Sequence, residues 1–467
     1  MQENKMLRRF REGQKLELPE MLSLIVSLAL PAIAGQISQV VMEYIDAGMV
    51  GHLGAEGSAA IGLVASTTWL IGSLLACAAL GFSVQMAQFI GAGQHKKAKN
   101  IFYEGLMVIL VWSILITVVT VGISGHLPYW LGGTGKAAEN GAAYFRIYAM
   151  SCPILAINWF GSDMMQSTGN FMIAGVAQIL GCMLDVLFNA FLIYPARILS
   201  LGTLTVWIPG ADLGVTGAAL GTLLAQLVSA ILLMYVLLFR TSILRWRRGD
   251  RFSFRKEDLK RALLIGLPVG VEQTIQMTAQ IFLTKIVSPL GTIAIAANSL
   301  AVTAEGLCYM PGFGIQTAAS TLVGQGIGAK REDLVKKLSM ITVGFGMAVM
   351  TVTGALMYLF APWIMAILSS DPSVQQLGAA VLRIEAFAEP LFAAEIVANG
   401  VFRGAGDTLV PSIIITVSMW FVRLPLAWFL APHIGLEGIW TAMAIQLSLQ
   451  GIVFLLRLRK VDFHKIM

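Results

Sequence analysis

The run LSLIVSLALPAIAGQISQVVM, residues 22–42, decides the fold class, because a segment this long and this apolar can lie in lipid. A helix needs about 20 such residues to cross the hydrocarbon core of a bilayer. Similar runs recur along the 467 residues, of which 57% are hydrophobic and only 12% charged. A soluble domain of this size cannot bury so many helices on all sides. The composition therefore predicts an all-α integral membrane protein.

Apolar runs bounded by glycine, proline and charge predict twelve transmembrane helices. Their ranges are 20–46, 56–90, 100–124, 142–165, 172–195, 212–240, 259–287, 293–324, 336–362, 379–402, 408–431 and 435–457. The polar and strongly basic stretch 241–258 separates an N-lobe, residues 1–240, from a C-lobe, residues 259–467. Each lobe then holds six helices, and 241–258 is a basic cytoplasmic linker.

The two halves repeat each other at a constant shift of 237 residues. The shift pairs Pro31 with Pro268, Gly54 with Gly291, Gln88 with Gln325, Gly91 with Gly328, Arg146 with Arg383, Pro153 with Pro390, and Gly169 with Gly406. Such a repeat predicts two pseudo-symmetric six-helix lobes around a central cleft. The register changes at 195–212, which indicates an insertion on the outer face. Pro31 and Pro268 lie inside helices, where a proline frees a carbonyl and permits a structural bend.

The net charge of +6 is distributed as in a membrane protein rather than a nucleic-acid-binding protein. Basic residues cluster at 5–15, 95–99, 245–261, 329–337 and 457–460, which fall on one side when the helices are counted in order. This asymmetry places both termini in the cytoplasm and needs no nucleic acid partner. Arg423, inside an apolar run, is interpreted as the counter-charge to an acid of the C-lobe.

Acidic and amide side chains inside the apolar runs are the candidate functional groups, because ionisable groups at membrane depth are costly and seldom without a role. In the first helix Gln39, Glu43 and Asp46 are spaced four and three apart, so they lie on one face. The fifth helix carries Asp185 and Asn189 at i, i+4. Such carboxylates can carry a proton, or can hold Na⁺ with neighbouring oxygens. Glu43 can equally lie at the interface, solvated.

The second half carries a further set of polar residues at membrane depth. Glu272, Gln276 and Gln280 recur every four residues in the seventh helix. Glu389 and Glu395 lie in the tenth helix, and the alternative for Glu385 and Glu389 is a solvated position near the outer interface. We interpret the five residues other than Glu385 as candidates for substrate binding or for protonation in the second lobe.

Five segments resemble the prokaryotic multidrug and toxic compound extrusion (MATE) family. They are PAIAGQISQVVMEYIDAGMVGHLG (31–54), AQFIGAGQHKKA (87–98), LDVLFNAFLIY (184–194), PGFGIQTAASTLVGQGIGAK (311–330) and GVFRGAGDT (400–408). The resemblance covers essentially the whole chain in the order of the family. It implies a monomeric antiporter of the bacterial cytoplasmic membrane, surrounded by membrane lipid, that exports organic cations and amphipathic drugs in exchange for H⁺ or Na⁺ by alternating access.

The resemblance also suggests roles for individual residues. Asp46 falls on the helix-one aspartate that is implicated in cation coupling in the family, and a Na⁺ ion between Asp46 and Asp185 is one possible form of coupling. Helix five often reads Asn-x-x-x-Asp in the family, whereas here Asp185 precedes Asn189. We therefore expect cation coupling in the N-lobe, with H⁺ favoured over Na⁺, and no cofactor beyond that ion.

The C-lobe departs from the family pattern. Where members with a C-lobe cation site have a helix-seven glutamate this chain has Gln276, and their helix-ten aspartate aligns with Phe392. A family-standard Na⁺ site is therefore not expected there, and Glu272 becomes a candidate for binding protons or a cationic substrate.

Two other functions compete with drug export. A lipid-linked oligosaccharide flippase of the same superfamily would need a cationic cavity for pyrophosphate, whereas the charges at membrane depth are mostly acidic here. An intramembrane transferase would need a DDxxD motif or a histidine cluster, and the sequence has neither. The GxxxxGK[ST] motif of ATP-driven pumps is absent as well. We therefore expect a transporter and not an enzyme.

Overall fold

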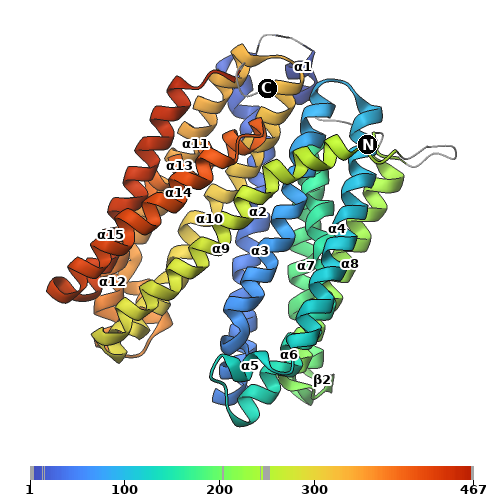
Figure 1. The fold of residues 1–467 in the computed structure, drawn as a ribbon. Coiled ribbons are helices and arrows are strands. Elements are labelled where there is room, and N and C mark those ends of the chain that lie inside the picture. The colour runs from blue at the N-terminus through green and yellow to red at the C-terminus, as the bar shows by residue number, and fades with distance from the viewer. Residues whose placement is uncertain are drawn as a thin grey trace. The chain divides into compact units, whose positions relative to one another are not determined.

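The computed structural model describes residues 5–12, 14, 16–201, 204–241, 243–245 and 253–463. These residues are almost entirely helical, and a helix or helix pair lies over each of the twelve predicted spans (Figure 1). Eight helical segments within this part of the chain are long and apolar enough to cross a membrane. The predicted fold class, an all-α integral membrane protein, is therefore confirmed.

The first six spans are helices α2 to α8. Their bounds are α2 Leu18–Gly51, α3 Ala55–Gly91, α4 His95–Ile123, α6 Gly135–Ser167, α7 Phe171–Leu192 and α8 Gly214–Tyr235, and the π-helical turn η1, Val236–Arg240, extends α8. Helix α2 continues past Pro31, as α9 continues past Pro268, so the bends at these two prolines stay predictions.

The second six spans are more broken than the sequence predicts. Their bounds are α9 Lys256–Val287, η2 Ser288–Leu290, α10 Thr292–Gly328, α11 Glu332–Leu368, α12 Pro372–Ala386, α13 Glu389–Ala405, α14 Leu409–Ser418, the π-helical turn η3 Met419–Arg423, and α15 Leu424–Lys460. Helix α15 is interrupted by a kink at Ile434 and Gly435, whose backbone is not helical, where the sequence predicts the boundary between the last two spans. The single helix predicted at 379–402 is wrong. It is two helices, and Pro390 stands in the first turn of α13, where its missing N–H costs no hydrogen bond.

Besides the short 3-10 helix η2, three short elements of the described chain were not predicted. They are α1, Lys5–Arg11, α5, Leu127–Trp130, and a hairpin of β1, Pro195–Leu201, and β2, Leu204–Ala211. The hairpin is antiparallel and pairs Pro195 with Ala211. It occupies the stretch where the repeat loses register, so the extra residues of the first half form a two-stranded ribbon.

The described residues form two compact units. The first holds Ser38–Met86 and His95–Leu263, and the second holds Gln2–Ile37, Ala87–Gln94 and Leu264–Met467. In the first unit α8 packs against both α6 and α7, and α4 packs against α6; in the second unit α13 contacts α10, α11 and α15 (Figure 1). The lobe boundaries at 240 and 259 and the central cleft stay predictions.

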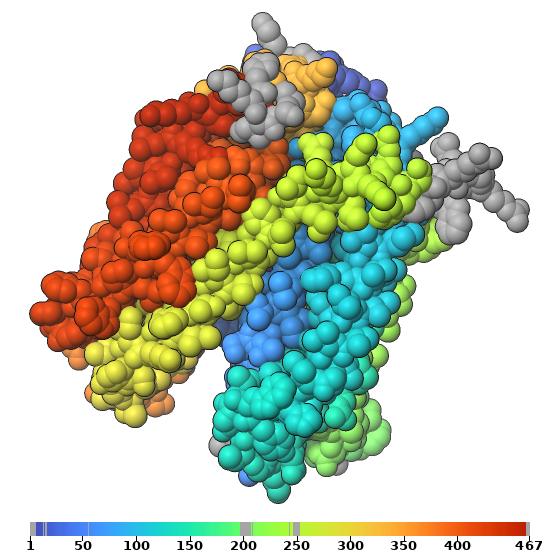
Figure 2. All heavy atoms as spheres, in the orientation of Figure 1, coloured from blue at the N-terminus to red at the C-terminus, as the bar shows by residue number. Residues whose placement is uncertain are grey.

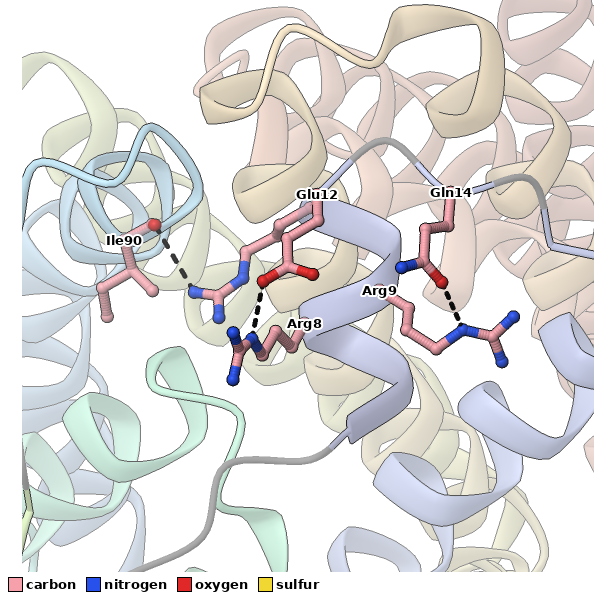
Figure 3. Close-up of polar contacts among 6 residues, drawn as sticks. Arg8, Arg9, Glu12, Gln14 and Ile90 are labelled. Carbon is pink, nitrogen blue, oxygen red and sulfur yellow. Dashed lines mark hydrogen bonds and ion pairs between the residues drawn. The ribbon is translucent and has the colours of Figure 1, made fainter.

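Helix α1 is anchored to the second unit by two buried side chains and an arginine. Leu7 and Phe10 are 0% exposed, and a Cβ on Gly326 of α10 would lie 2.9 Å from Cζ of Phe10. Arg11 donates a 3.5 Å hydrogen bond to the carbonyl oxygen of Ile90 at the end of α3 (Figure 3). The basic segment at the N-terminus is therefore partly a packed helix.

Two further polar contacts of α1 are local. Arg8 donates to Glu12 over 2.6 Å within one turn, and Arg9 donates to Gln14 over the same distance (Figure 3). Arg9 also pairs with Glu20 in the first turn of α2, with 2.7 Å between nitrogen and oxygen. Solvent screens the exposed Arg8–Glu12 pair, and the part-buried Arg9–Glu20 pair joins α1 to the start of α2, so neither contributes much stability.

Candidate acid clusters in the membrane

The first unit brings Asp46 of α2 together with Asp185 and Asn189 of α7. Asn189 Nδ2 lies 2.9 Å from Asp46 Oδ1 and 3.2 Å from Asp185 Oδ2, so one amide donates to both acids. The two carboxyl groups lie close enough to share a hydrogen bond. Asp185 and Asn189 are 0% exposed, and Asp46 is partly buried. We call Asp46, Asp185 and Asn189 the N-site.

Two oxygens of the N-site have no partner within the described residues. They are Oδ1 of Asp185 and Oδ1 of Asn189, both buried. No described lysine or arginine is among the groups that interact with either acid, whose partners are each other, Asn189 and Thr222. Two neighbouring carboxylates repel each other, so a proton or a cation bound between them would stabilise the cluster. Hard oxygen ligands of this kind suit H⁺ or Na⁺.

A glycine on a third helix makes room for the N-site. Gly221 of α8 faces Asn189, and a Cβ at position 221 would lie 3.0 Å from Cγ of Asn189 and closer still to its Oδ1. Any side chain there would push against the amide that bridges the two acids. Sequence reasoning misses both Gly221, which has no side chain, and Thr222, whose single hydroxyl in an apolar helix is a weak signal.

The other predicted residues of the α2 stripe form a chain next to the N-site. Gln178 of α7 donates to Gln39 over 3.0 Å, and Gln39 donates to Glu43 over 3.4 Å. Glu43 is partly buried and its charge interacts with that of Asp46. The structure therefore places Gln39, Glu43 and Asp46 on one polar face, as their spacing predicted, and adds Gln178 from the facing helix.

In the second unit Glu272 of α9 is the centre of one cluster. Ser412 of α14 donates to its Oε2 over 2.6 Å, and Gln276 donates to its Oε1 over 3.2 Å. Glu272 is 3% exposed, and the charges of Arg403 and Glu395 interact with it. Glu272, Gln276 and Glu395 therefore belong to one group with a basic residue beside it, which we call the C-site.

Glu389 lies in a different cluster of the second unit. Its charge interacts with that of Glu305, and its carboxyl group lies near the thiol of Cys308 on α10. Glu385 interacts with both glutamates and with Arg423. Glu385 and Glu389 are 0% exposed, and none of their four carboxyl oxygens has a hydrogen-bond partner among the described residues. The alternative of a solvated position for Glu385 and Glu389 is therefore wrong.

Gln280 stands apart from both clusters, because its side chain is exposed. Arg423 lies where the sequence suggested, near Glu305 and Glu385, and its guanidinium also contacts Met443 over 2.6 Å. No three His, Cys, Asp or Glu side chains in the described part of the chain lie close enough together to hold a metal ion. The possible Na⁺ at Asp46 and Asp185 would thus depend on two carboxylates and amide oxygens.

Comparison with known proteins assigns the family. The family model MatE matches this chain twice, over residues 31–191 and 268–429. The chain belongs to the MatE family. The two matches begin at Pro31 and Pro268, the pair that defines the repeat, so each half of the chain is one MatE unit.

MatE relatives match nearly the whole chain. A protein of Thermotoga maritima named "Probable multidrug resistance protein NorM" is 26% identical over 455 residues, covering 95% of this chain and 93% of its own length. "Multidrug resistance protein MdtK" of Edwardsiella ictaluri is 23% identical, covering 93% of this chain and 94% of its own length. A solved structure described as an outward-facing multidrug resistance MATE family transporter of the MOP superfamily is 24% identical with a TM-score of 0.88, covering 100% of this chain and 99% of that one. At 24% identity, the similarity to this solved structure supports the fold alone.

Proposed function

We propose that this protein is a secondary active antiporter that exports cationic or amphipathic drugs in exchange for H⁺ or Na⁺ by alternating access. The N-site is the observation that carries the proposal. It is a pair of adjacent carboxyl groups, Asp46 and Asp185, held by one amide and without a basic partner among the described residues. The names of the relatives, multidrug resistance proteins, support drugs as the substrates.

The coupling step follows from the charge of the N-site. With both carboxylates ionised the pair repels itself, and an entering H⁺ or Na⁺ removes that repulsion. Since Asp46 and Asp185 belong to different helices, α2 and α7, cation binding stabilises the arrangement in which these helices lie close. Release of the cation favours their separation, so occupancy of the site can shift the balance between two conformations of the first unit.

The C-site supplies a second candidate for the chemistry of transport. Glu272 is buried, is held by Ser412 and Gln276, and lies near Arg403. We propose that Glu272 binds protons or a cationic substrate, and that the nearby charge of Glu395 influences whether Glu272 is ionised. The acidic clusters as a whole suit an organic cation better than an anionic head group. We further propose that the protein is a monomer of the bacterial cytoplasmic membrane and that both its termini lie in the cytoplasm.

Efflux from everted membrane vesicles tests this function. A cationic dye such as ethidium would be followed under separate proton and sodium gradients, for the wild type, Asp46→Asn, Asp185→Asn and Glu272→Gln. The matched control is Asp163→Asn, an acid of α6 in the first unit that contributes to none of the clusters. We expect Asp46→Asn and Asp185→Asn to abolish gradient-driven efflux, and Glu272→Gln to impair it, while Asp163→Asn retains it.

Two results would refute the proposal. Gradient-driven efflux that survives in all three variants would remove the coupling role from these acids. A protein that moved a polyprenyl-linked sugar but no cationic dye would instead be a lipid-linked oligosaccharide flippase. Comparing the two gradients decides between H⁺ and Na⁺, because only the coupling ion drives efflux when it is supplied alone.

A further inference from the structure

A cavity of about 600 Å³ lies in the second unit between the C-terminal end of α9 and the segment from η3 into α15. Phe282 and Lys285 line it from α9, and Trp420, Leu424 and Trp428 line it from the other side. Figure 2 shows the end of α9 in yellow against the orange-red α14–α15 segment on one face of the molecule. The volume lies within the ~300–1,000 Å³ range typical of small-ligand sites.

The lining of this cavity is apolar and aromatic apart from one cation. Lys285 is the only charged residue among the described side chains that line it. Its Nζ lies 5.7 Å from the centroid of the Phe282 ring, and no described carboxylate forms an ion pair with it. An exposed ammonium without an acidic partner can attract an anion. The cavity therefore combines apolar walls that can contact a hydrocarbon chain with one ammonium group that can contact a negatively charged group.

The position of the cavity along the helices matches the edge of a membrane. Lys285 stands in the last turn of α9, at the opposite end of that helix from its mixed-charge start, KEDLKR. Trp428 is 73% exposed and the neighbouring Phe429 61% exposed. An exposed tryptophan beside a lysine is typical of the level where lipid head groups meet the hydrocarbon core. A ligand here would reach the site from the bilayer.

We propose that this cavity binds one anionic phospholipid, with an acyl chain along Trp420, Leu424 and Trp428 and the head group on Lys285. The proposal is independent of the antiport function, because none of the lining residues belongs to the N-site or the C-site. A zwitterionic phospholipid also carries a phosphate, but its own ammonium cancels the net charge. An anionic lipid therefore gains about fivefold in affinity from a single lysine near the head groups.

Native mass spectrometry of the purified, delipidated full-length protein tests the site. Phosphatidylglycerol and phosphatidylethanolamine with identical acyl chains are titrated in parallel, and bound lipid is counted. We expect the wild type to retain phosphatidylglycerol preferentially, Lys285→Gln to reduce that retention about fivefold without changing phosphatidylethanolamine binding, and Lys285→Arg to keep it. Trp428→Ala should weaken the binding of both lipids, because it removes the wall that both acyl chains share.

Two matched variants control for charge and for aromatic surface. Lys136→Gln removes an exposed lysine from the first turn of α6, and Trp363→Ala removes a tryptophan of α11 that is 74% exposed and outside the cavity. Both should bind lipid as the wild type does. The proposal is overturned if Lys285→Gln and Lys136→Gln lose phosphatidylglycerol equally, or if neither loses any. Displacement of the bound lipid by ethidium at transport concentrations would also overturn it, since the cavity would then belong to the substrate.

Discussion

Replacing Gly221 by alanine should disable the N-site without touching either acid. The new Cβ would lie 3.0 Å from Cγ of Asn189 and 3.1 Å from its backbone nitrogen, whereas ordinary contacts begin at 3.4 Å. The amide must therefore move by at least about 0.4 Å, and further at its Oδ1. Movement of Asn189 weakens two hydrogen bonds to carboxyl groups, each worth about 1.5–3 kcal/mol. Because these hydrogen bonds stabilise the ionised carboxylates, their loss should make the pair bind H⁺ about 10-fold to 100-fold more tightly, so that release of the ion and exchange fail.

The assay measures both the site and the fold. Cation affinity is read from the proton or sodium dependence of efflux, and stability from thermal unfolding in detergent, where overpacking should cost about 1–3 kcal/mol. Gly62→Ala is the control, because a Cβ at Gly62 of α3 meets nothing within 4 Å. It should leave coupling intact and stabilise the helix slightly.

A double-mutant cycle separates the proposed cause from general damage. If Gly221→Ala acts through Asn189, it should add little to the loss of coupling in an Asn189→Ala background, because the amide it displaces is already gone. Additive losses would show that the two substitutions act independently. Full coupling in Gly221→Ala would refute the reasoning outright.

Three further predictions concern the second unit. Ser412→Ala removes the 2.6 Å hydrogen bond to Glu272, and thermal unfolding should show a loss of about 2 kcal/mol; an unchanged melting temperature would mean that Glu272 is held by other groups. Asp407→Asn breaks the ion pair with Arg457, whose guanidinium lies 4.2 Å from the Phe402 ring centroid, so the free energy of unfolding should fall by about 2 kcal/mol. Adding Arg457→Gln to this variant should lower the stability little further, and additive losses would contradict the pairing. Gly328→Ala would place a Cβ 2.8 Å from the carbonyl carbon of Gln88, and should cost about 1–3 kcal/mol in the same assay, whereas a neutral substitution would show that the contact yields.

The sequence predicts the helices well because each long apolar run is itself the physical reason for a membrane span. The sequence predicts the breaks between helices less well. Pro390 signals a bend inside a helix, but whether the chain bends or starts a new helix depends on whether the preceding residues keep their hydrogen bonds. In the structure α12 ends at Ala386 and α13 begins at Glu389. That outcome is decided by packing against neighbouring helices, which a single sequence does not contain.

The candidate sites were predictable as stripes but not as clusters. Gln39, Glu43 and Asp46 lie on one face because they are three or four residues apart. Gln280 follows Glu272 by eight residues, which at about 100° per residue is an offset of about 80°, and its side chain is exposed as that drift suggests.

The same geometry explains why the tenth predicted helix contributes to two clusters. Glu389 and Glu395 are six residues apart, which places them about 240° apart around α13. Two side chains on such different faces cannot reach one site, so Glu395 lies near Glu272 and Glu389 lies near Glu305. The partners Ser412, Gln178 and Thr222 come from other helices, and no spacing rule within one helix predicts them.

The internal repeat has a physical counterpart at the end of α3 and the end of α10, both in the second unit. A Cβ at Gly91 would collide with the backbone of Gln325, and a Cβ at Gly328 would collide with the backbone of Gln88. The shift of 237 residues pairs Gln88 with Gln325 and Gly91 with Gly328, so each glycine lies against the repeat partner of its own neighbouring glutamine. Reciprocal contacts of this kind are what a two-fold relation produces. A glutamine followed three residues later by a glycine therefore forms each side of one close contact between α3 and α10. This contact explains why both halves of the chain carry the pattern at the same place.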